Sequence, residues 1–125
     1  MKKLLLLLIF IFSISPVYAE WKLMTELDDF NTYIETNSLG HRGKVVSYWV
    51  LYDFSSLQIN GVSSKKVKWE DNCDTEEHRT LSAVKYSEKM GGGNVLPNPP
   101  QISGWEHIVP GTIGDFYHKF VCKKR

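Results

Sequence analysis

The sequence predicts an α+β domain, in which a small antiparallel β-sheet of about six strands carries one C-terminal α-helix packed on one face. Strand-like segments recur at short intervals and are separated by turn residues. The chain also holds four Trp and six Tyr, which are residue types that favour strands. Only the C-terminal segment shows the apolar spacing of a helix, so a single helix is expected.

The first nineteen residues have the pattern of a secretory signal peptide. Two lysines precede an apolar run from Leu4 to Phe12, and small residues at Val17 and Ala19 mark a cleavage site before Glu20. The apolar run is too short to span a bilayer, although an uncleaved N-terminal anchor is the alternative. The residue at the cleavage site is Glu20 and not a cysteine, so no lipid anchor is expected. We therefore expect an exported chain that is periplasmic, secreted or at the cell surface, with residues 20–125 as its single domain.

The charge balance excludes some partner classes. The chain has 15 Lys and Arg against 14 Asp and Glu, and signal cleavage would remove Lys2 and Lys3. A nearly neutral domain lacks the basic field that binding to nucleic acid or to anionic membranes requires. A protein partner is therefore expected, without nucleic acid and without a stable membrane anchor after cleavage.

The strand pattern is strongest in the middle of the chain. Residues 20–26 and 31–36 are expected as the first two strands, and residues 37–44 as a turn. Residues 44–54 place apolar side chains on both faces, which predicts a central strand that is covered on both sides.

The second half of the predicted sheet is a hairpin followed by a long connection. Residues 62–73 and 78–88 are expected to pair across the acidic turn 74–77. The Gly- and Pro-rich residues 89–104 are expected as a mobile or functional connection, and residues 105–109 as a last short strand.

The C-terminal segment predicts an amphipathic helix of about ten residues that begins after Thr112. Asp115 stands at the capping-box position three residues after this cap. The expected apolar stripe consists of Ile113, Phe116, Tyr117, Phe120 and Val121. A helix this short needs to be docked, and its exposed edge is expected to carry Asp115, His118 and Lys119.

Cys73 and Cys122 are the two cysteines of the chain. In an exported protein they are expected to form a disulfide, which would tie the helix to the sheet, and two free buried thiols are the alternative.

No motif predicts catalysis, a metal or a cofactor. Cys73 and His78 are the one candidate nucleophile and base, and an oxidised Cys73 cannot attack a substrate. His118 and Cys122 have a ligand-like i, i+4 spacing, but two ligands do not make a site, so surface histidines are expected instead. The glycines of residues 90–94 lack the rest of a phosphate loop and are expected to supply flexible or positive-φ backbone in a turn.

A run of basic residues beside Trp69 is the candidate ligand-binding patch. Lys65, Lys66 and Lys68 lie on one expected strand, with Arg79 and Lys85 on its neighbour. Such a patch would bind acidic host polymers or protein, and the alternative is an ordinary solvated strand face.

Three segments resemble the surface-adhesin protein E family of Gram-negative bacteria. They are "WVLYDF" (residues 49–54), "KWEDNC" (68–73) with the following "HRTLSAVKYSEKMGGG" (78–93), and "GWEHIVPGTIGDFYHKFVC" (104–122). The resemblance implies an antiparallel sheet with a packed C-terminal helix and places Cys73 and Cys122 in register with the family's cysteines. It also implies binding of host extracellular-matrix and serum proteins at the bacterial surface.

The first hypothesis is accordingly a non-enzymatic exported binding module, with the sheet face or the connection 90–104 as its contact surface. The second is a periplasmic structural or envelope-stress domain that binds bacterial envelope components.

Overall fold

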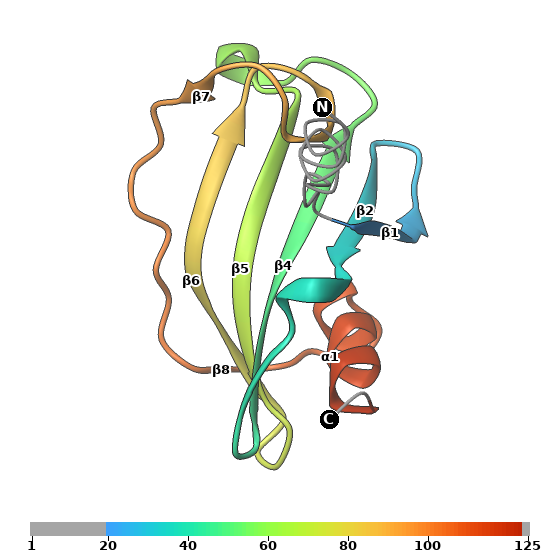
Figure 1. Ribbon diagram of the computed structural model, residues 1–125, viewed down its shortest axis with the longest axis vertical. Helices are drawn as coiled ribbons and strands as arrows, with labels where there is room; N and C mark the ends of the chain where they lie inside the picture. Colours follow the sequence, from blue (N-terminus) through green and yellow to red (C-terminus); the bar gives the residue numbers. More distant parts are fainter. Residues whose placement is uncertain (1–19, 124–125) are drawn as a thin grey trace, which may run out of the picture.

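Residues 20–123, the part of the chain that the computed structural model describes, form one antiparallel sheet and one C-terminal helix (Figure 1). The strands follow the order β1-β2-β4-β5-β6-β7, with β3 paired to β4 and β8 paired to β6. Their bounds are β1 Trp21–Glu26, β2 Phe30–Glu35, β3 Gly40–Arg42, β4 Val45–Phe54, β5 Ser64–Asn72, β6 Glu77–Tyr86, β7 Val95–Leu96 and β8 Glu106–His107. Helix α1 spans Ile113–Lys123, and three short 3-10 turns are η2 Thr36–Ser38, η3 Ile59–Gly61 and η4 Lys89–Gly91. The predicted fold class is confirmed.

Two short strands were not predicted. Strand β3 lies inside the expected turn 37–44, and β7 lies inside the expected connection 89–104. Each has only two or three residues, which is too few to show a sequence period. Strand β3 exists because β2 pairs only with the second half of β4, from Val50 to Phe54, and leaves the first half free to pair.

Strand β4 lies in the middle of the sheet, as its two apolar faces predict. Val46, Tyr48 and Val50 are fully buried on one face, and Leu51 is fully buried on the other. Turn η4 covers Leu51 from that other side, where Gly91 has φ +73° and approaches the Leu51 and Lys66 side chains. The positive φ of Gly91 favours glycine, and a Cβ there would lie 2.7 Å from Lys66 Cε, so the end of the Lys66 side chain would have to shift.

Helix α1 packs against the half of β4 that begins at Val45 (Figure 1). Tyr117 and Val121 are fully buried in this contact. The Tyr117 ring stacks on Tyr48 with centroids 6.0 Å apart and meets Trp69 edge-on at 5.8 Å. Tyr117 also donates a hydrogen bond from its hydroxyl to Thr32 Oγ1 at 2.8 Å. Tyr117 therefore connects the helix to β4 and β5 through ring contacts and to β2 through its hydroxyl. We call this side of the sheet the helix-side face.

The helix begins as its cap residues predict. The backbone N–H of Asp115 donates to Thr112 Oγ1 at 3.2 Å. The Asp115 carboxylate accepts from the Gly111 N–H at 3.0 Å and from Lys119 Nζ at 3.2 Å. These hydrogen bonds, first that of Gly111, lower the pKa of Asp115.

The expected apolar stripe of the helix is partly wrong. Phe116 is 45% exposed, whereas His118, expected on the exposed edge and as a surface histidine, is only 8% exposed. The buried side consists of Gly114, Tyr117, His118 and Val121, which is a stripe rotated away from Phe116. A Cβ at Gly114 would lie 2.9 Å from the His78 ring, so this glycine allows the close approach of helix and sheet.

A buried polar network explains the position of His118. Asp71 on β5 is fully buried, and its two carboxylate oxygens bond to Tyr48 Oη at 2.9 Å and to His118 Nδ1 at 2.9 Å. Desolvation raises the pKa of Asp71, while the hydrogen bonds from His118 and Tyr48 oppose that rise. The helix turns His118 inward because a buried carboxylate without partners would be costly.

The predicted disulfide between Cys73 and Cys122 is confirmed. It joins the residue after β5 to the last turn of α1, with Cα atoms 5.7 Å apart and 49 residues of separation along the chain. Tyr117 and this disulfide therefore attach the middle and the last turn of the helix to the sheet.

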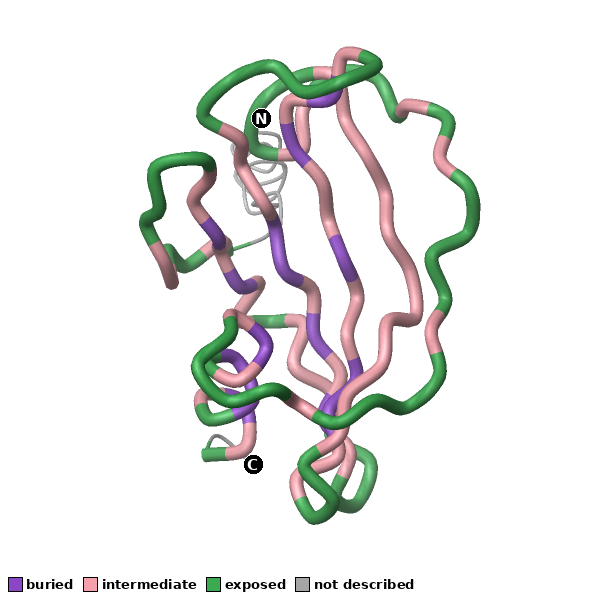
Figure 2. Tube along the Cα trace, turned by 180° about the vertical axis from the view of Figure 1, so that it is seen from behind, coloured by how far each residue is buried: buried purple, intermediate pink, exposed green. Residues whose placement is uncertain are grey.

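The Gly- and Pro-rich connection runs along the outer edge of β6, exposed over most of its length (Figures 1 and 2). Ser103 donates its N–H to the Thr80 carbonyl at 3.0 Å and accepts from the Thr80 N–H at 2.8 Å. Asn98 Nδ2 donates to the Ala83 carbonyl at 3.1 Å. The connection therefore occupies hydrogen-bonding groups of an edge strand that would otherwise pair with another chain.

Within residues 20–123, no helix is long and apolar enough to span a membrane. The predicted signal peptide, residues 1–19, and the basic residues Lys124 and Arg125 lie outside the described residues.

Replacing both cysteines by serine is expected to destabilise the domain. The Cys73→Ser/Cys122→Ser variant loses a cross-link that closes a loop of 49 residues, which the chain-entropy model values at about 4 kcal/mol. Urea denaturation monitored by tryptophan fluorescence measures the change, and reduced wild type serves as the control. An unfolding midpoint equal to that of the oxidised wild type would contradict this role.

Candidate functional site

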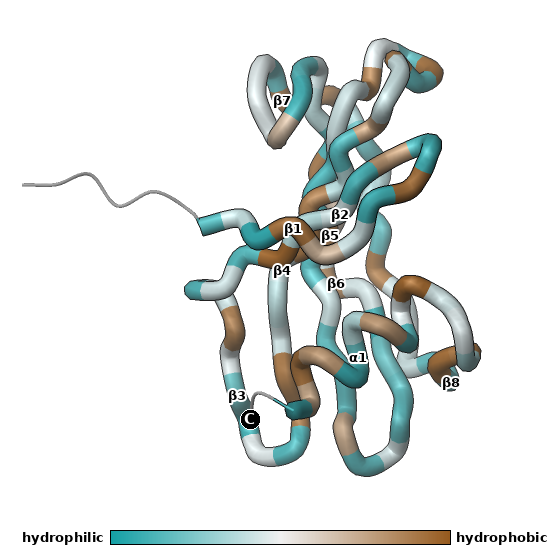
Figure 3. The backbone as a smooth tube through the Cα atoms, turned by 90° about the vertical axis from the view of Figure 1, so that its right-hand side faces the viewer, coloured by the Kyte–Doolittle hydropathy of each residue, from teal (hydrophilic) through white to brown (hydrophobic). Residues whose placement is uncertain are grey.

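The face of the sheet opposite α1 carries an alternating set of aromatic and basic side chains, which we call the open face. The strand register shows which side chains belong to this face, because directly paired residues point to the same side of a sheet. Trp49 pairs with Lys68, Leu51 with Lys66, and Ser47 with Glu70. On the next strand, Arg79 pairs with Glu70 and Tyr86 pairs with Ser64. Figure 3 shows the backbone from the side of the molecule on which α1 lies in Figure 1.

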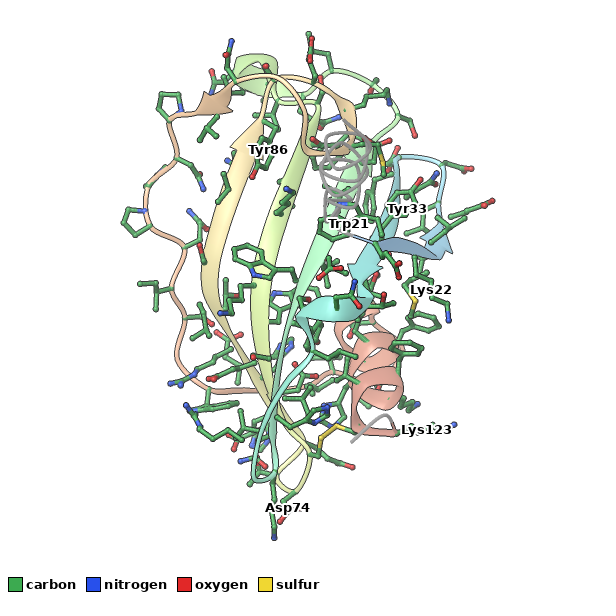
Figure 4. All side chains as sticks on the ribbon, viewed as in Figure 1. Trp21, Lys22, Tyr33, Asp74, Tyr86 and Lys123 are labelled. Carbon is green, nitrogen blue, oxygen red and sulfur yellow. A yellow bond between two sulfur atoms is a disulfide. The ribbon has the colours of Figure 1, made fainter. Side chains whose placement is uncertain are left out.

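The lysines of the open face lie over aromatic rings. Lys66 Nζ is 5.5 Å from the centroid of Trp21 and 5.0 Å from that of Tyr86, so it connects β1 to β6 across the sheet (Figure 4). Lys68 Nζ is 6.0 Å from the centroid of Trp49. These distances are in the range of cation–π attraction, which orients each ammonium group without neutralising it.

A pocket of about 290 Å³ lies among these residues. Trp21, Trp49, Lys66 and Tyr86 line it together with Glu35. The Glu35 carboxylate already accepts the backbone N–H groups of Glu20 at 3.0 Å and Asn37 at 3.2 Å. Neither Lys66 nor Lys68 forms an ion pair with a carboxylate anywhere in residues 20–123.

Arg79 has a different role from the two lysines. Its guanidinium contacts the Glu70 carboxylate through Nε and Nη2, each at 2.7 Å from Oε1. Arg42 adds a contact to Glu70 Oε2 at 3.5 Å, and the Glu70 side chain is only 8% exposed. Arg79 also stacks on Trp105, 4.6 Å from the ring centroid, and so attaches the segment before β8 to the sheet. The charge of Arg79 is therefore paired with Glu70 inside the domain, unlike the charges of the two lysines.

The predicted basic patch is therefore divided between two faces. Lys66, Lys68 and Arg79 lie on the open face, but Lys65 and Lys85 pair with each other on the helix-side face. Trp69 also lies on the helix-side face, where its ring meets Tyr117. The grouping of all these residues in one patch was wrong because consecutive residues of a strand point to opposite sides.

Sequence reasoning missed the aromatic part of the open face. Trp21, Trp49 and Tyr86 come from three strands that are far apart in the chain. The alternation of side chains along β4 places Trp49 and Tyr48 on opposite faces, so the sequence could have predicted Trp49 on the open face. Trp21 and Tyr86 lie near the same lysine, Lys66, only because of the order of the strands in the sheet. A local sequence pattern contains no information on that order.

The described residues hold no group of three His, Cys, Asp or Glu side chains that could bind a metal ion. His78 packs against Trp69 and Gly114 beneath the helix. Cys122 Sγ lies 3.7 Å from His118 Nε2, but this sulfur is bonded to Cys73. The histidines nearest to the disulfide are therefore part of the packed helix–sheet contact.

The two kinds of basic residue are expected to differ in their effect on stability. Arg79→Ala should lower the free energy of unfolding by about 1–3 kcal/mol, because it leaves the buried Glu70 carboxylate short of hydrogen bonds. Lys66→Ala should cost less than about 1 kcal/mol, since it removes only a half-exposed cation–π contact. Urea denaturation of both variants measures the difference, and equal losses would refute the distinction.

The fold is similar to that of solved structures of Haemophilus influenzae protein E. One such structure has a TM-score of 0.65 at 15% identity, with 89% of each chain covered. A second, of the selenomethionine form, has a TM-score of 0.67 at 14% identity and covers 88% of this chain and 92% of that chain. A third, of protein E from non-typeable Haemophilus influenzae, has a TM-score of 0.64 at 14% identity, with 88% and 81% covered. No curated protein matches the sequence.

The sequence itself matches a family model over nearly the whole described region. The model described as surface-adhesin protein E matches residues 21–123, from the first residue of β1 to the last residue of α1. The resemblance of the three sequence segments is thereby confirmed, and the chain belongs to the surface-adhesin protein E family.

Proposed function

We propose that this chain is an exported, non-enzymatic binding module that contacts host extracellular-matrix or serum proteins through its open face. Membership of the adhesin family supports the class of function. We choose the open face because the charges of Lys66 and Lys68 have no carboxylate partner in the described part of the chain.

The side chains of the open face suit a protein contact. Aromatic residues and cations dominate the energetics of many interfaces because they bury large area with few rotatable bonds. Trp21, Trp49 and Tyr86 are half-buried and surround a pocket that a partner's side chain could enter. The aromatic rings restrict both lysines before binding, which lowers the entropy lost when a partner orders them.

The charge pattern favours acidic segments of a partner protein. The chain as a whole is nearly neutral, with a formal net charge of +1, so attraction comes from the local arrangement. Glu70 is already paired with Arg79 and Arg42, and Glu35 with backbone N–H groups. Lys66 and Lys68 are therefore the charges of this face that a carboxylate of the partner can reach.

The buried titratable groups support a non-enzymatic role. Asp71 and His118 bond to each other beneath α1, and both are buried. A catalytic acid or base needs access to a substrate, and this pair is instead enclosed by the helix contact.

Charge reversal on the open face is expected to weaken binding. In a solid-phase assay with immobilised matrix and serum glycoproteins, Lys66→Glu and Lys68→Glu should each reduce the affinity about tenfold, because attraction to an acidic segment becomes repulsion. Lys123→Glu, an equal charge change at the exposed end of α1, is the matched control and should change affinity by less than about twofold.

Two results would count against this function. The first is wild-type binding no greater than that of an unrelated secreted protein at micromolar concentration. The second is retention of the native protein inside the periplasm, protected from external protease, which would favour the alternative of an envelope domain that binds bacterial components.

A further inference from the structure

A second pocket lies on the helix-side face, at the end of the sheet that α1 does not reach. The helix packs around Val46, Tyr48 and Val50, whereas this pocket lies beyond Tyr52, near Phe54 and the turn η3. Its volume is about 340 Å³. Phe54, Ile59 and Val62 supply apolar walls, and Lys65 and Lys85 supply two cations.

The two lysines face each other without a counterion. Lys65 and Lys85 are direct partners in the β5–β6 register, and directly opposite like charges destabilise a sheet. Neither forms an ion pair with a carboxylate of residues 20–123. Lys65 instead lies over the Tyr52 ring, 4.7 Å from its centroid.

Burial and the repulsion between the two lysines both affect the pKa of Lys65. Burial lowers the pKa of its ammonium group, and the charge of Lys85 lowers it further. Both side chains are only half-exposed, so solvent screens their repulsion incompletely. Two cations held together beside a concave surface form a site that is complementary to an anion.

We propose that this pocket binds a phosphomonoester group between Lys65 and Lys85. A phosphomonoester carries nearly two negative charges at neutral pH and three strong acceptor oxygens, which matches two facing ammonium groups. The organic body attached to the phosphate lies against the apolar side chains of Phe54 and Ile59, of which Ile59 is 86% exposed. Binding removes the repulsion between the lysines, so the ligand also stabilises the fold.

The site is separate from the open face. Lys65 and Lys66 are adjacent in sequence but point to opposite sides of β5, so each face can be changed without altering the other. The proposal consequently does not depend on the binding of host proteins through Lys66 and Lys68.

Phenyl phosphate is a suitable probe, because it joins the phosphate group to a small apolar body. Added to the full chain expressed with its own N-terminal segment, it should raise the unfolding temperature and shift the backbone NMR signals of Asn60, Lys65 and Lys85. Phenol at the same concentration and sodium chloride at the same ionic strength should produce neither effect.

Variants locate the site. Lys65→Gln and Lys85→Gln should each weaken phenyl phosphate binding about tenfold, since each removes a charge-assisted hydrogen bond. Without ligand, Lys85→Gln should be at least as stable as wild type, because the repulsion is relieved, whereas Lys65→Gln also loses the cation–π contact with Tyr52. Lys66→Gln, on the other face, is the matched control and should bind phenyl phosphate as wild type does.

A comparison of two probes distinguishes a soluble ligand from a lipid headgroup. Flotation with vesicles that contain phosphatidic acid, whose headgroup is a phosphomonoester, should depend on Lys65 and Lys85 if the natural source is a lipid. Binding of phenyl phosphate without such flotation identifies a soluble phosphomonoester. The proposal is overturned if neither probe binds at millimolar concentration, or if Lys66→Gln weakens binding as much as Lys65→Gln.

Discussion

The contact of Tyr117 with Tyr48 and Trp69 determines which face of the sheet is covered. Aromatic pairs of this kind contribute about 0.5–1.5 kcal/mol each beyond the area that they bury. An eleven-residue helix is too short to be stable alone, so this contact and the disulfide to Cys73 are what maintain α1 as a helix. The buried Asp71, bonded to Tyr48 and His118, then sets the rotation of the helix, because other rotations would leave its carboxylate short of partners.

The position of α1 determines which parts of the two sheet faces remain accessible. The helix covers half of one face and thereby leaves the Lys65–Lys85 pocket at the other end of that face. The opposite face keeps Trp21, Trp49 and Lys66 accessible around a pocket. The connection after η4 shields the edge of β6, so the faces of the sheet, more than this edge, are available for contacts.

The sequence predicted the parts of the fold that depend on local patterns. Strand β4 was evident because its alternation runs over ten residues, and α1 because Thr112 caps an amphipathic stripe. The pairing of Asp71 with His118 spans 47 residues and depends on helix rotation, so no local signal records it. Strand alternation was enough to predict that Lys65 and Lys66 point to opposite faces of the sheet. The residues that each lysine contacts could not be predicted, because they depend on the order of the strands.

We expect the open face to make the contacts with a partner, because α1 is packed against its own sheet. Hydroxyl-radical footprinting of the protein, free and in complex with a glycoprotein identified by the solid-phase assay, tests this directly. We expect oxidation of Trp21, Trp49 and Tyr86 to fall on binding, while that of Phe116, exposed on α1, stays unchanged. Protection of Phe116 with unchanged oxidation of Trp21 and Trp49 would instead place the contact on α1.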